Sequence, residues 1–220
     1  MAKPYLLLLP GLLCDAALYK AQVEGLADIV DPVVGDLTKD DSVAGMAARA
    51  LAAAPDAFAL VGLSMGGYVA MEILRQAPER VTRLALLDTS AKPDTDEKRD
   101  KRRAMMAQAQ RGKFKGVTPK LLPSLVAEAH RTGPVADEVL AMAGRVGKAA
   151  FLRQQTAIMN RPDSRPTLAT VTVSTLVGVG AQDEITPLEE AEEMHALIKG
   201  SRAFEDQETG ALDEGRDHPA

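Results

Sequence analysis

Residues 60–69 read LVGLSMGGYV, and this stretch decides how the rest of the sequence is interpreted. The apolar run AFALVGL leads into Ser64, and YVAMEILRQA continues beyond it with apolar residues at helical spacing. Gly62 and Gly66 complete the pattern G-x-S-x-G. A serine between glycines at a strand-to-helix turn is typical of a nucleophile elbow, in which a sharp turn presents the hydroxyl. The plain alternative is a serine that caps a helix in a glycine-rich turn.

Outward from Ser64, strand and helix patterns alternate through the first 90 residues. Short apolar runs predict strands, and apolar residues at helical spacing between them predict helices. The predicted strands are 4–10, 29–37, 57–63 and 81–90, and the predicted helices are 15–27, 43–54 and 65–77. This order predicts an α/β fold with a mostly parallel sheet and helices on both of its faces.

The pattern changes after residue 90, because helical patterns then continue to about residue 160 before strand-like residues return. The later predicted elements are a strand at 171–180, a helix at 187–200 and a short strand at 201–206. Ligands of open parallel sheets bind at the carboxyl ends of the strands, where a helical insertion would form a lid. The predicted division is an α/β core of residues 1–90 and 166–206, a helical cap insertion of residues 91–165 and an irregular acidic tail of residues 207–220.

The composition of the 220 residues fits one globular domain and argues against several functional classes. A net charge of −5 gives no broad cationic surface for nucleic acid or an acidic membrane. Aromatic residues make up 3% of the chain, which argues against base-stacking platforms, and no apolar stretch approaches the length of a membrane span. The single cysteine, Cys14, allows no internal disulfide, so we expect a cytoplasmic protein.

Three segments carry a resemblance to a known family: LPGLLCDAALY at 9–19, GLSMGG at 62–67 and GAQDEITP at 180–187. In this order, with a helical insertion before the last, they resemble the α/β-hydrolase superfamily and in particular its small esterase-like members with a helical cap. The resemblance covers roughly residues 4–206. It implies hydrolysis of an ester or a related acyl bond in a small molecule, with no metal or organic cofactor.

The resemblance also implies a nucleophile and an oxyanion hole. Ser64 matches the nucleophile of the superfamily. The superfamily uses two backbone N–H groups to bind the oxyanion, one from the residue after the nucleophile, here Met65. The other comes from the loop after the first strand, where Leu12 matches and Leu13 is the second candidate. A plain strand-ending turn is the alternative for this loop.

The acid of the catalytic triad should follow the strand after the cap, and Asp183 occupies that place, three residues beyond Gly180. A buried carboxylate there would orient a histidine and stabilise its cation. Asp183 could instead be an ordinary turn residue. Asp88, at the end of the strand LALLD, is the second candidate for the acid, because some members of the superfamily use that position.

The histidine that serves as the catalytic base in the superfamily is not at its expected place in this sequence. The family places a Gly-His pair directly after the last strand, whereas this chain has Gly210 and Ala211 there. His195 is expected on the solvated side of a helix and His130 in the cap insertion. His218 is the remaining candidate for the base, if the tail folds back over the strand ends. Otherwise the tail is out of frame or cut short, or the chain is an inactive form.

The function that follows is a serine hydrolase acting on an ester or related acyl bond of a small-molecule substrate, impaired because the catalytic histidine is not at its expected place. The alternative is a catalytically inactive pseudoenzyme or a small-ligand-binding module on the same fold. Ester, thioester, lactone and carbon–carbon bonds all remain open as substrates. Three arginines that could meet a substrate carboxylate are expected at the surface: Arg131, Arg153 and Arg161.

Overall fold

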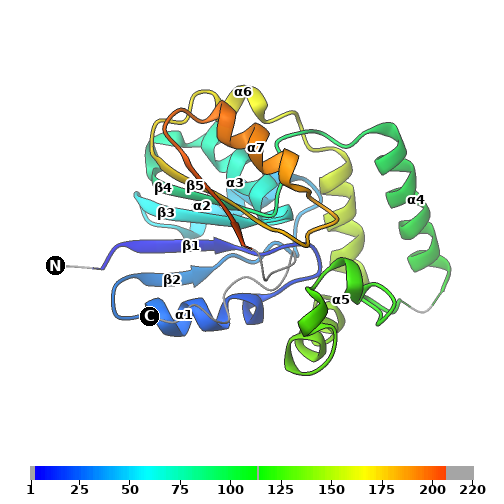
Figure 1. The fold of residues 1–220 in the computed structure, drawn as a ribbon. Coiled ribbons are helices and arrows are strands. Elements are labelled where there is room, and N and C mark those ends of the chain that lie inside the picture. The colour runs from blue at the N-terminus through cyan, green and yellow to red at the C-terminus, as the bar shows by residue number, and fades with distance from the viewer. Residues whose placement is uncertain (1–2, 113, 207–220) are drawn as a thin grey trace.

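The computed structural model describes residues 3–112 and 114–206, and these form an α/β fold around one six-stranded sheet (Figure 1). The strand order is β2-β1-β3-β4-β5-β6, and every adjacent pair is parallel. The strands are β1 Tyr5–Leu9, β2 Asp31–Val34, β3 Phe58–Leu63, β4 Val81–Leu87, β5 Ser174–Gly180 and β6 Arg202–Asp206. The predicted α/β fold class is confirmed.

Helical segments connect successive strands, as parallel pairing requires. The α-helices are α1 Lys20–Leu26, α2 Val43–Ala53, α3 Met65–Gln76, α4 Asp96–Arg111, α5 Pro134–Met159, α6 Arg165–Leu168 and α7 Leu188–Leu197. The 3-10 helices are η1 Ala16–Tyr19, η2 Pro78–Arg80, η3 Leu122–Ser124 and η4 Glu128–His130. Within the described segments, no helix is long and apolar enough to cross a membrane.

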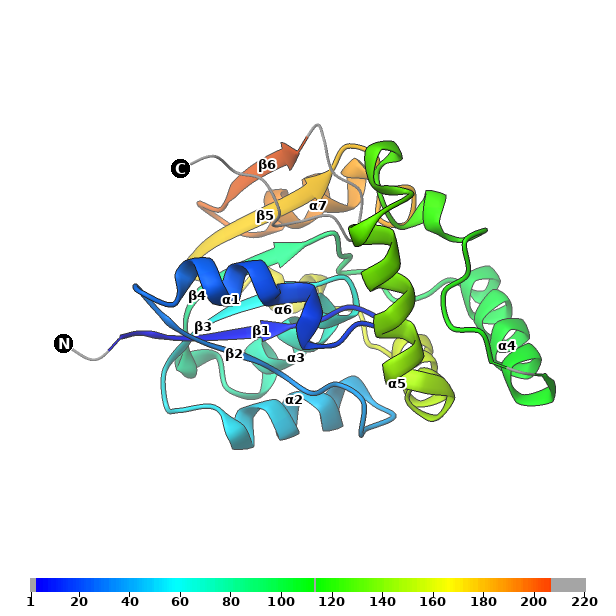
Figure 2. The same cartoon turned by 90° about the horizontal axis from the view of Figure 1, so that it is seen from below.

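Helices cover both faces of the sheet, and β1 shows how the sequence divides between them (Figure 2). Side chains alternate along a strand, so Leu6 and Leu8 point to one face and Leu7 and Leu9 to the other. The first pair packs with η1 and α1, and the second pair packs with α2 and α3. A strand buried on both sides explains the unbroken apolar run that predicted β1.

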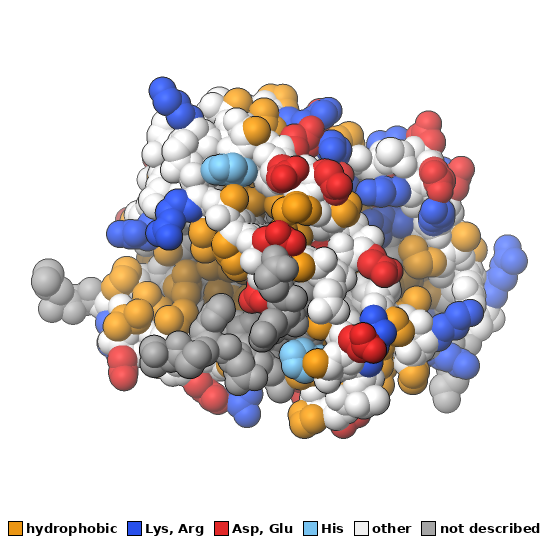
Figure 3. All heavy atoms as spheres, in the orientation of Figure 1, with side chains coloured by type: hydrophobic (Ala, Val, Ile, Leu, Met, Phe, Trp, Pro, Cys, Tyr) orange, Lys and Arg blue, Asp and Glu red, His pale blue; other side chains and the backbone are white. Residues whose placement is uncertain are grey.

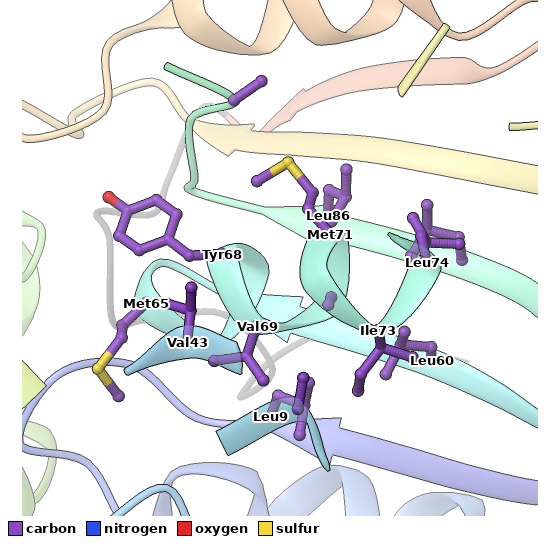
Figure 4. Packing of buried hydrophobic residues seen from close by; sticks show 14 of the residues in the cluster. Leu9, Val43, Leu60, Met65, Tyr68, Val69, Met71, Ile73, Leu74 and Leu86 are labelled. Atoms are coloured by element: carbon purple, nitrogen blue, oxygen red, sulfur yellow. The ribbon is translucent and has the colours of Figure 1, made fainter. Parts of the chain in front are cut away.

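Helix α3 lies in the centre of the larger core and carries the residue that follows the candidate nucleophile. Its residues from Met65 through Leu74 are buried, as expected for a helix that is apolar on most of its circumference. Figure 4 shows Val69 and Ile73 of this helix beside Leu9 of β1 and Leu60 of β3. The beginning of α3 is therefore fixed against the strands by close packing.

Helices α4 and α5 lie beyond the carboxyl ends of the strands, away from the faces of the sheet (Figures 1 and 2). Residue Gly147 interrupts α5 with φ 75° and ψ 175°, so its two halves run in different directions. Val139 and Met142 of the first half pack in a small separate cluster with Cys14. Ile158 of the second half belongs to the main core under α3.

Candidate active site

Ser64 forms a sharp turn between β3 and α3. Its backbone has φ 52° and ψ −114°, a strained conformation for a residue other than glycine. The N–H of Ser64 donates to the carbonyl oxygen of Leu87 at 2.9 Å. Its own carbonyl oxygen accepts from the N–H of Gly67 at 2.9 Å and from the hydroxyl of Thr89 at 2.8 Å. These three hydrogen bonds hold the turn between the ends of β3 and β4.

The glycines of the motif are required by close approach of backbone segments. A Cβ atom at Gly66 would overlap the carbonyl oxygen of Leu9 in β1, and one at Gly62 would lie 2.6 Å from the carbonyl oxygen of Gly66. A Cβ at Gly67 would overlap the side chain of Thr89. The pattern G-x-S-x-G-G therefore lets the start of α3 pack directly against the end of the sheet.

The loop after β1 lies against Ser64. A Cβ at Gly11 would be 3.5 Å from the Cβ of Ser64. Leu13 has φ 61°, and its N–H donates to Oε1 of Gln154 in α5 at 3.2 Å. Among the hydrogen bonds of the described residues, neither the N–H of Leu12 nor that of Met65 has an acceptor. These two N–H groups, unlike that of Leu13, remain available to an anion beside Ser64.

Asp183 lies in the turn between β5 and α7 and is buried. Its Oδ1 accepts from the N–H groups of Ile185 at 2.7 Å and Thr186 at 3.0 Å. The hydroxyl of Thr186 donates to the second oxygen, Oδ2. Both oxygens of this carboxylate therefore stabilise the turn in which it lies.

Asp88 follows β4 directly and is 1% exposed, with φ 42°. Its N–H donates to the carbonyl oxygen of Gly178 at 3.0 Å, and its Oδ1 accepts from the N–H of Gly180 at 2.8 Å. The carbonyl oxygen of Gly180 accepts from the N–H of Asp183 at 3.0 Å. Both candidate acids are thus hydrogen-bonded to Gly180, the last residue of β5.

The described residues include two histidines, one on α7 and one in η4, whose Glu128 N–H donates to Oε1 of Gln182 at 3.3 Å, next to Asp183. His195 is exposed on α7, with Nδ1 2.7 Å from Oγ of Ser201, and His130 is half-buried in η4. The candidate base His218 lies outside the described residues, as do Gly210 and Ala211. No histidine between residues 3 and 206 lines the cavity described below.

A cavity of about 770 Å³ opens above Ser64. The core contributes Leu12, Ser64 and Tyr68 to its wall, and the region between β4 and β5 contributes Met105, Leu125 and Phe151. Its wall is mainly apolar, and its size is in the usual range for a small-molecule site. The described residues include no group of three or more His, Cys, Asp or Glu placed to hold a metal ion.

Cys14 also lines this cavity but is not a competing nucleophile. It is 3% exposed, and burial raises the pKa of its thiol to about 12, so the thiol stays protonated at neutral pH. A thiol must lose its proton to attack a carbonyl efficiently.

The family model described as the alpha/beta hydrolase fold matches residues 39–213 of this chain. The chain belongs to the α/β-hydrolase family. This α/β hydrolase is 30% identical over 162 residues to the pimeloyl-[acyl-carrier protein] methyl ester esterase of Neisseria meningitidis serogroup B, an alignment that covers 71% of this chain and 63% of the relative. It therefore matches less than two thirds of that curated relative's length.

Solved structures agree with the family. A thermophilic esterase from Thermogutta terrifontis, determined with malate bound, is 30% identical to this α/β hydrolase with a TM-score of 0.86, covering 96% of this chain and 84% of that one. An enol-lactonase from Burkholderia xenovorans LB400 has a TM-score of 0.78 at 20% identity, covering 96% of this chain and 85% of that one. At 20% identity, the similarity to the enol-lactonase shows only a shared fold.

The α/β hydrolase also contains a buried ionic cluster beside the cavity, which the sequence did not reveal. Asp94 accepts from Nε of Arg102 and from Nη1 of Arg161, both at 2.6 Å. The guanidinium carbon of Arg161 lies 4.2 Å from the centroid of the Tyr68 ring. Burial alone would raise the pKa of Asp94, but the hydrogen bonds and charges of the two arginines outweigh it and lower that pKa.

The expectation that Arg161 lies at the surface is wrong. Its side chain is 5% exposed, because Asp94 and the carbonyl oxygens of Lys92 and Ile158 satisfy its donors in the interior. Nothing in the flanking sequence, NRPDSRP, distinguishes this arginine from a surface residue. Gln154 was likewise missed, since its partners lie more than 100 residues away along the chain.

Proposed function

We propose that this chain is a serine hydrolase that cleaves a carboxylic ester of a small molecule. The observation that carries the proposal is the strained turn at Ser64, which opens into a largely apolar cavity of about 770 Å³. A backbone strain of this kind costs about 1–3 kcal/mol and persists where the surrounding structure enforces it. The glycines packed around Ser64 enforce it here.

In the proposed reaction, Oγ of Ser64 attacks the carbonyl carbon of the ester. The resulting oxyanion accepts hydrogen bonds from the N–H groups of Met65 and Leu12, which are the two unoccupied donors beside Ser64 among the described residues. Each such donor is typically worth about 3 kcal/mol in the transition state. The base that removed the proton from Oγ gives it to the leaving alkoxide, so an alcohol departs, and water activated by the same base then hydrolyses the acyl-enzyme and releases the acid and Ser64.

The remaining roles are proposed from the family resemblance. Asp183 is the acid, with Asp88 in reserve, and His218 is the base. Both carboxylates are buried near the carboxyl ends of β4 and β5, Asp88 after β4 and Asp183 after β5, which supports a role in orienting a neighbouring cation. If His218 is not the general base, the oxyanion hole and substrate binding alone still accelerate hydrolysis about 10³-fold over the reaction in water.

Residues 91–165 are proposed to form the cap over a core of residues 1–90 and 166–206, with residues 207–220 as the tail. The placement of α4 and α5 beyond the strand ends supports this division (Figure 1). The name of the curated relatives, which are methyl ester esterases, supports a carboxylic ester as the substrate class. The inactive alternative, a ligand-binding pseudoenzyme, is favoured by one sequence observation, the alanine at position 211.

The test is hydrolysis of 4-nitrophenyl acetate by the wild type, Ser64→Ala and His218→Ala. Ser174→Ala is the control, because Ser174 is exposed and does not line the cavity. Loss of activity in both active-site variants indicates a hydrolase in which His218 is the base. Loss in Ser64→Ala alone indicates a hydrolase without that base. Activity that does not depend on Ser64 would leave only the binding module.

A further inference from the structure

We propose that the cavity selects an ester whose acyl part ends in a carboxylate, and that Arg102 is the residue that binds this carboxylate. The inference deepens the proposed function and rests on it, because it concerns the substrate of the same site. The substrate class is then the half-ester of a dicarboxylic acid.

The first observation is the charge of the cavity wall. Three cationic side chains line it, those of Arg102, Lys115 and Lys120. Among the described residues, the lining includes no aspartate or glutamate. The whole chain carries a net charge of −5, so this cavity is locally positive within a negative protein. A low-dielectric cavity lined by one sign of charge concentrates ligands of the opposite sign.

The second observation is that the ionic cluster beside the cavity contains more positive than negative charge. One carboxylate, that of Asp94, lies between two guanidinium groups and is itself 0% exposed. Arg161 is enclosed, with 5% of its side chain exposed, whereas Arg102 is 18% exposed and lines the cavity. The surplus positive charge is therefore accessible through Arg102.

The donors of Arg102 show how it could hold a ligand. Its Nε donates to Asp94 at 2.6 Å and its Nη1 to Oε1 of Gln155 at 2.9 Å, so the side chain is oriented before a ligand binds. Among the described residues, its Nη2 has no hydrogen-bond acceptor. An oriented guanidinium with a free donor is well suited to a carboxylate.

The third observation is that apolar side chains line the same cavity as Ser64 and Arg102. Tyr68 lies one helical turn beyond Ser64 on α3 and lines the cavity under the guanidinium of Arg161. Met105 and Phe151 provide apolar surface for methylene groups. Lys115 and Lys120 are exposed, so they contribute a longer-range attraction that salt reduces. Figure 3 shows Lys and Arg side chains interspersed with Asp and Glu over α4.

The test compares two esters with the same six-carbon chain, the mono-4-nitrophenyl ester of adipate and 4-nitrophenyl hexanoate. The quantity measured is the ratio of their kcat/KM values. We expect the wild type to prefer the anionic ester roughly tenfold or more, and Arg102→Gln to reduce the ratio by a similar factor. Arg103→Gln is the matched control, because Arg103 is exposed on the same helix and does not line the cavity.

A ratio near one in the wild type, or one that Arg102→Gln leaves unchanged, would overturn the assignment. Binding of hexanoate and hexanamide, measured by calorimetry, separates this failure from failure of the proposed function, because it requires no chemistry. If Ser64-dependent cleavage is absent but hexanoate binds more tightly than hexanamide and loses that advantage in Arg102→Gln, the anion site stands and the hydrolase proposal fails. Equal binding of the two ligands would reject the anion site.

Discussion

The side chain of Gln154 accepts a hydrogen bond from the backbone N–H of Leu13, with 3.2 Å between nitrogen and Oε1. The same amide donates through Nε2 to the carbonyl oxygen of Leu37, also at 3.2 Å, and the residue is 0% exposed. A single side chain of α5 thus fixes the loops that follow β1 and β2. It also occupies the N–H of Leu13, which leaves Leu12 as the available donor in that loop.

Replacing Gln154 with leucine should therefore impair both stability and catalysis. The change leaves the N–H of Leu13 and the carbonyl of Leu37 buried without partners, at a cost of about 1–3 kcal/mol. We expect kcat to fall more than KM rises, because the loop that carries the N–H of Leu12 loses its anchor. Steady-state kinetics and thermal unfolding measure the two effects, with the exposed Gln110→Leu as control. A lower Tm with unchanged kcat would show that the loop keeps its position without Gln154.

Substituting Gly66 with alanine should be severely destabilising, because its Cβ would overlap the carbonyl oxygen of Leu9. Backbone atoms cannot move aside as a flexible side chain does, so we expect a loss of more than about 3 kcal/mol or failure to fold. Gly25→Ala is the matched control. No atom lies within 4 Å of its Cβ position in α1, so that change should stabilise by about 0.5–1 kcal/mol. Denaturant unfolding compares the two, and equal effects would refute the close approach.

The cluster around Asp94 predicts a pH-dependent stability. Asp94→Asn removes the only negative charge between Arg102 and Arg161 within that cluster, and we expect it to destabilise the fold by about 3 kcal/mol at pH 7. The pKa of Asp94 in the folded state lies below its ordinary value of 3.8. Its contribution is therefore complete above that value and is lost as the pH falls through the folded pKa.

Thermal unfolding of the wild type and Asp94→Asn should accordingly differ at pH 7 and converge as the pH is lowered below about 4. Asp100→Asn serves as the control, because Asp100 is an exposed residue of α4 paired with the exposed Arg103. A difference in Tm that is the same at pH 3 and pH 7 would contradict the proposed role of the Asp94 charge.

The two candidate acids can be separated by asparagine substitutions. An asparagine oxygen can still accept the N–H of Gly180 at position 88, or the N–H groups of Ile185 and Thr186 at position 183. Folding should therefore be largely retained, while an acid that orients a histidine would lose its charge. We expect Asp183→Asn to reduce kcat by a factor of about 10² or more and Asp88→Asn to reduce it less. The reverse order would transfer the role to Asp88.

The local elements could be predicted from the sequence because each depends on a short pattern. Before the turn at Ser64, the sequence predicts a strand at 57–63, and the structure has one at 58–63. After the turn, it predicts a helix at 65–77, and the structure has one at 65–76. The strand expected at 81–90 ends at residue 87, because Asp88 adopts φ 42° and leaves the sheet. The strand expected at 29–37 is only 31–34, an edge strand that pairs with β1 alone.

Contacts between distant segments could not be predicted in this way. Gln154 and Leu13 are 141 residues apart, and Arg161 and Asp94 are 67 apart. Neither pair has a periodicity or a motif, since their proximity results from how α5 crosses the strand ends. The motif located Ser64, but the cavity and its cationic wall depend on residues that the sequence alone gave no reason to group.

The interruption of α5 at Gly147 divides the cover of the cavity into two parts that pack mainly against different elements. Ile158 after the break is anchored in the main core, while Val139 and Met142 before it pack in a smaller cluster with Cys14, and Ala143 and Phe151 pack together across the break. Evolution or an engineer can therefore rebuild the segment of residues 134–146 to admit differently shaped molecules. Such remodelling would have to keep the packing of Met142 with Cys14 and the ion pair of Arg145 with Asp15, because both reach the loop that carries Leu12.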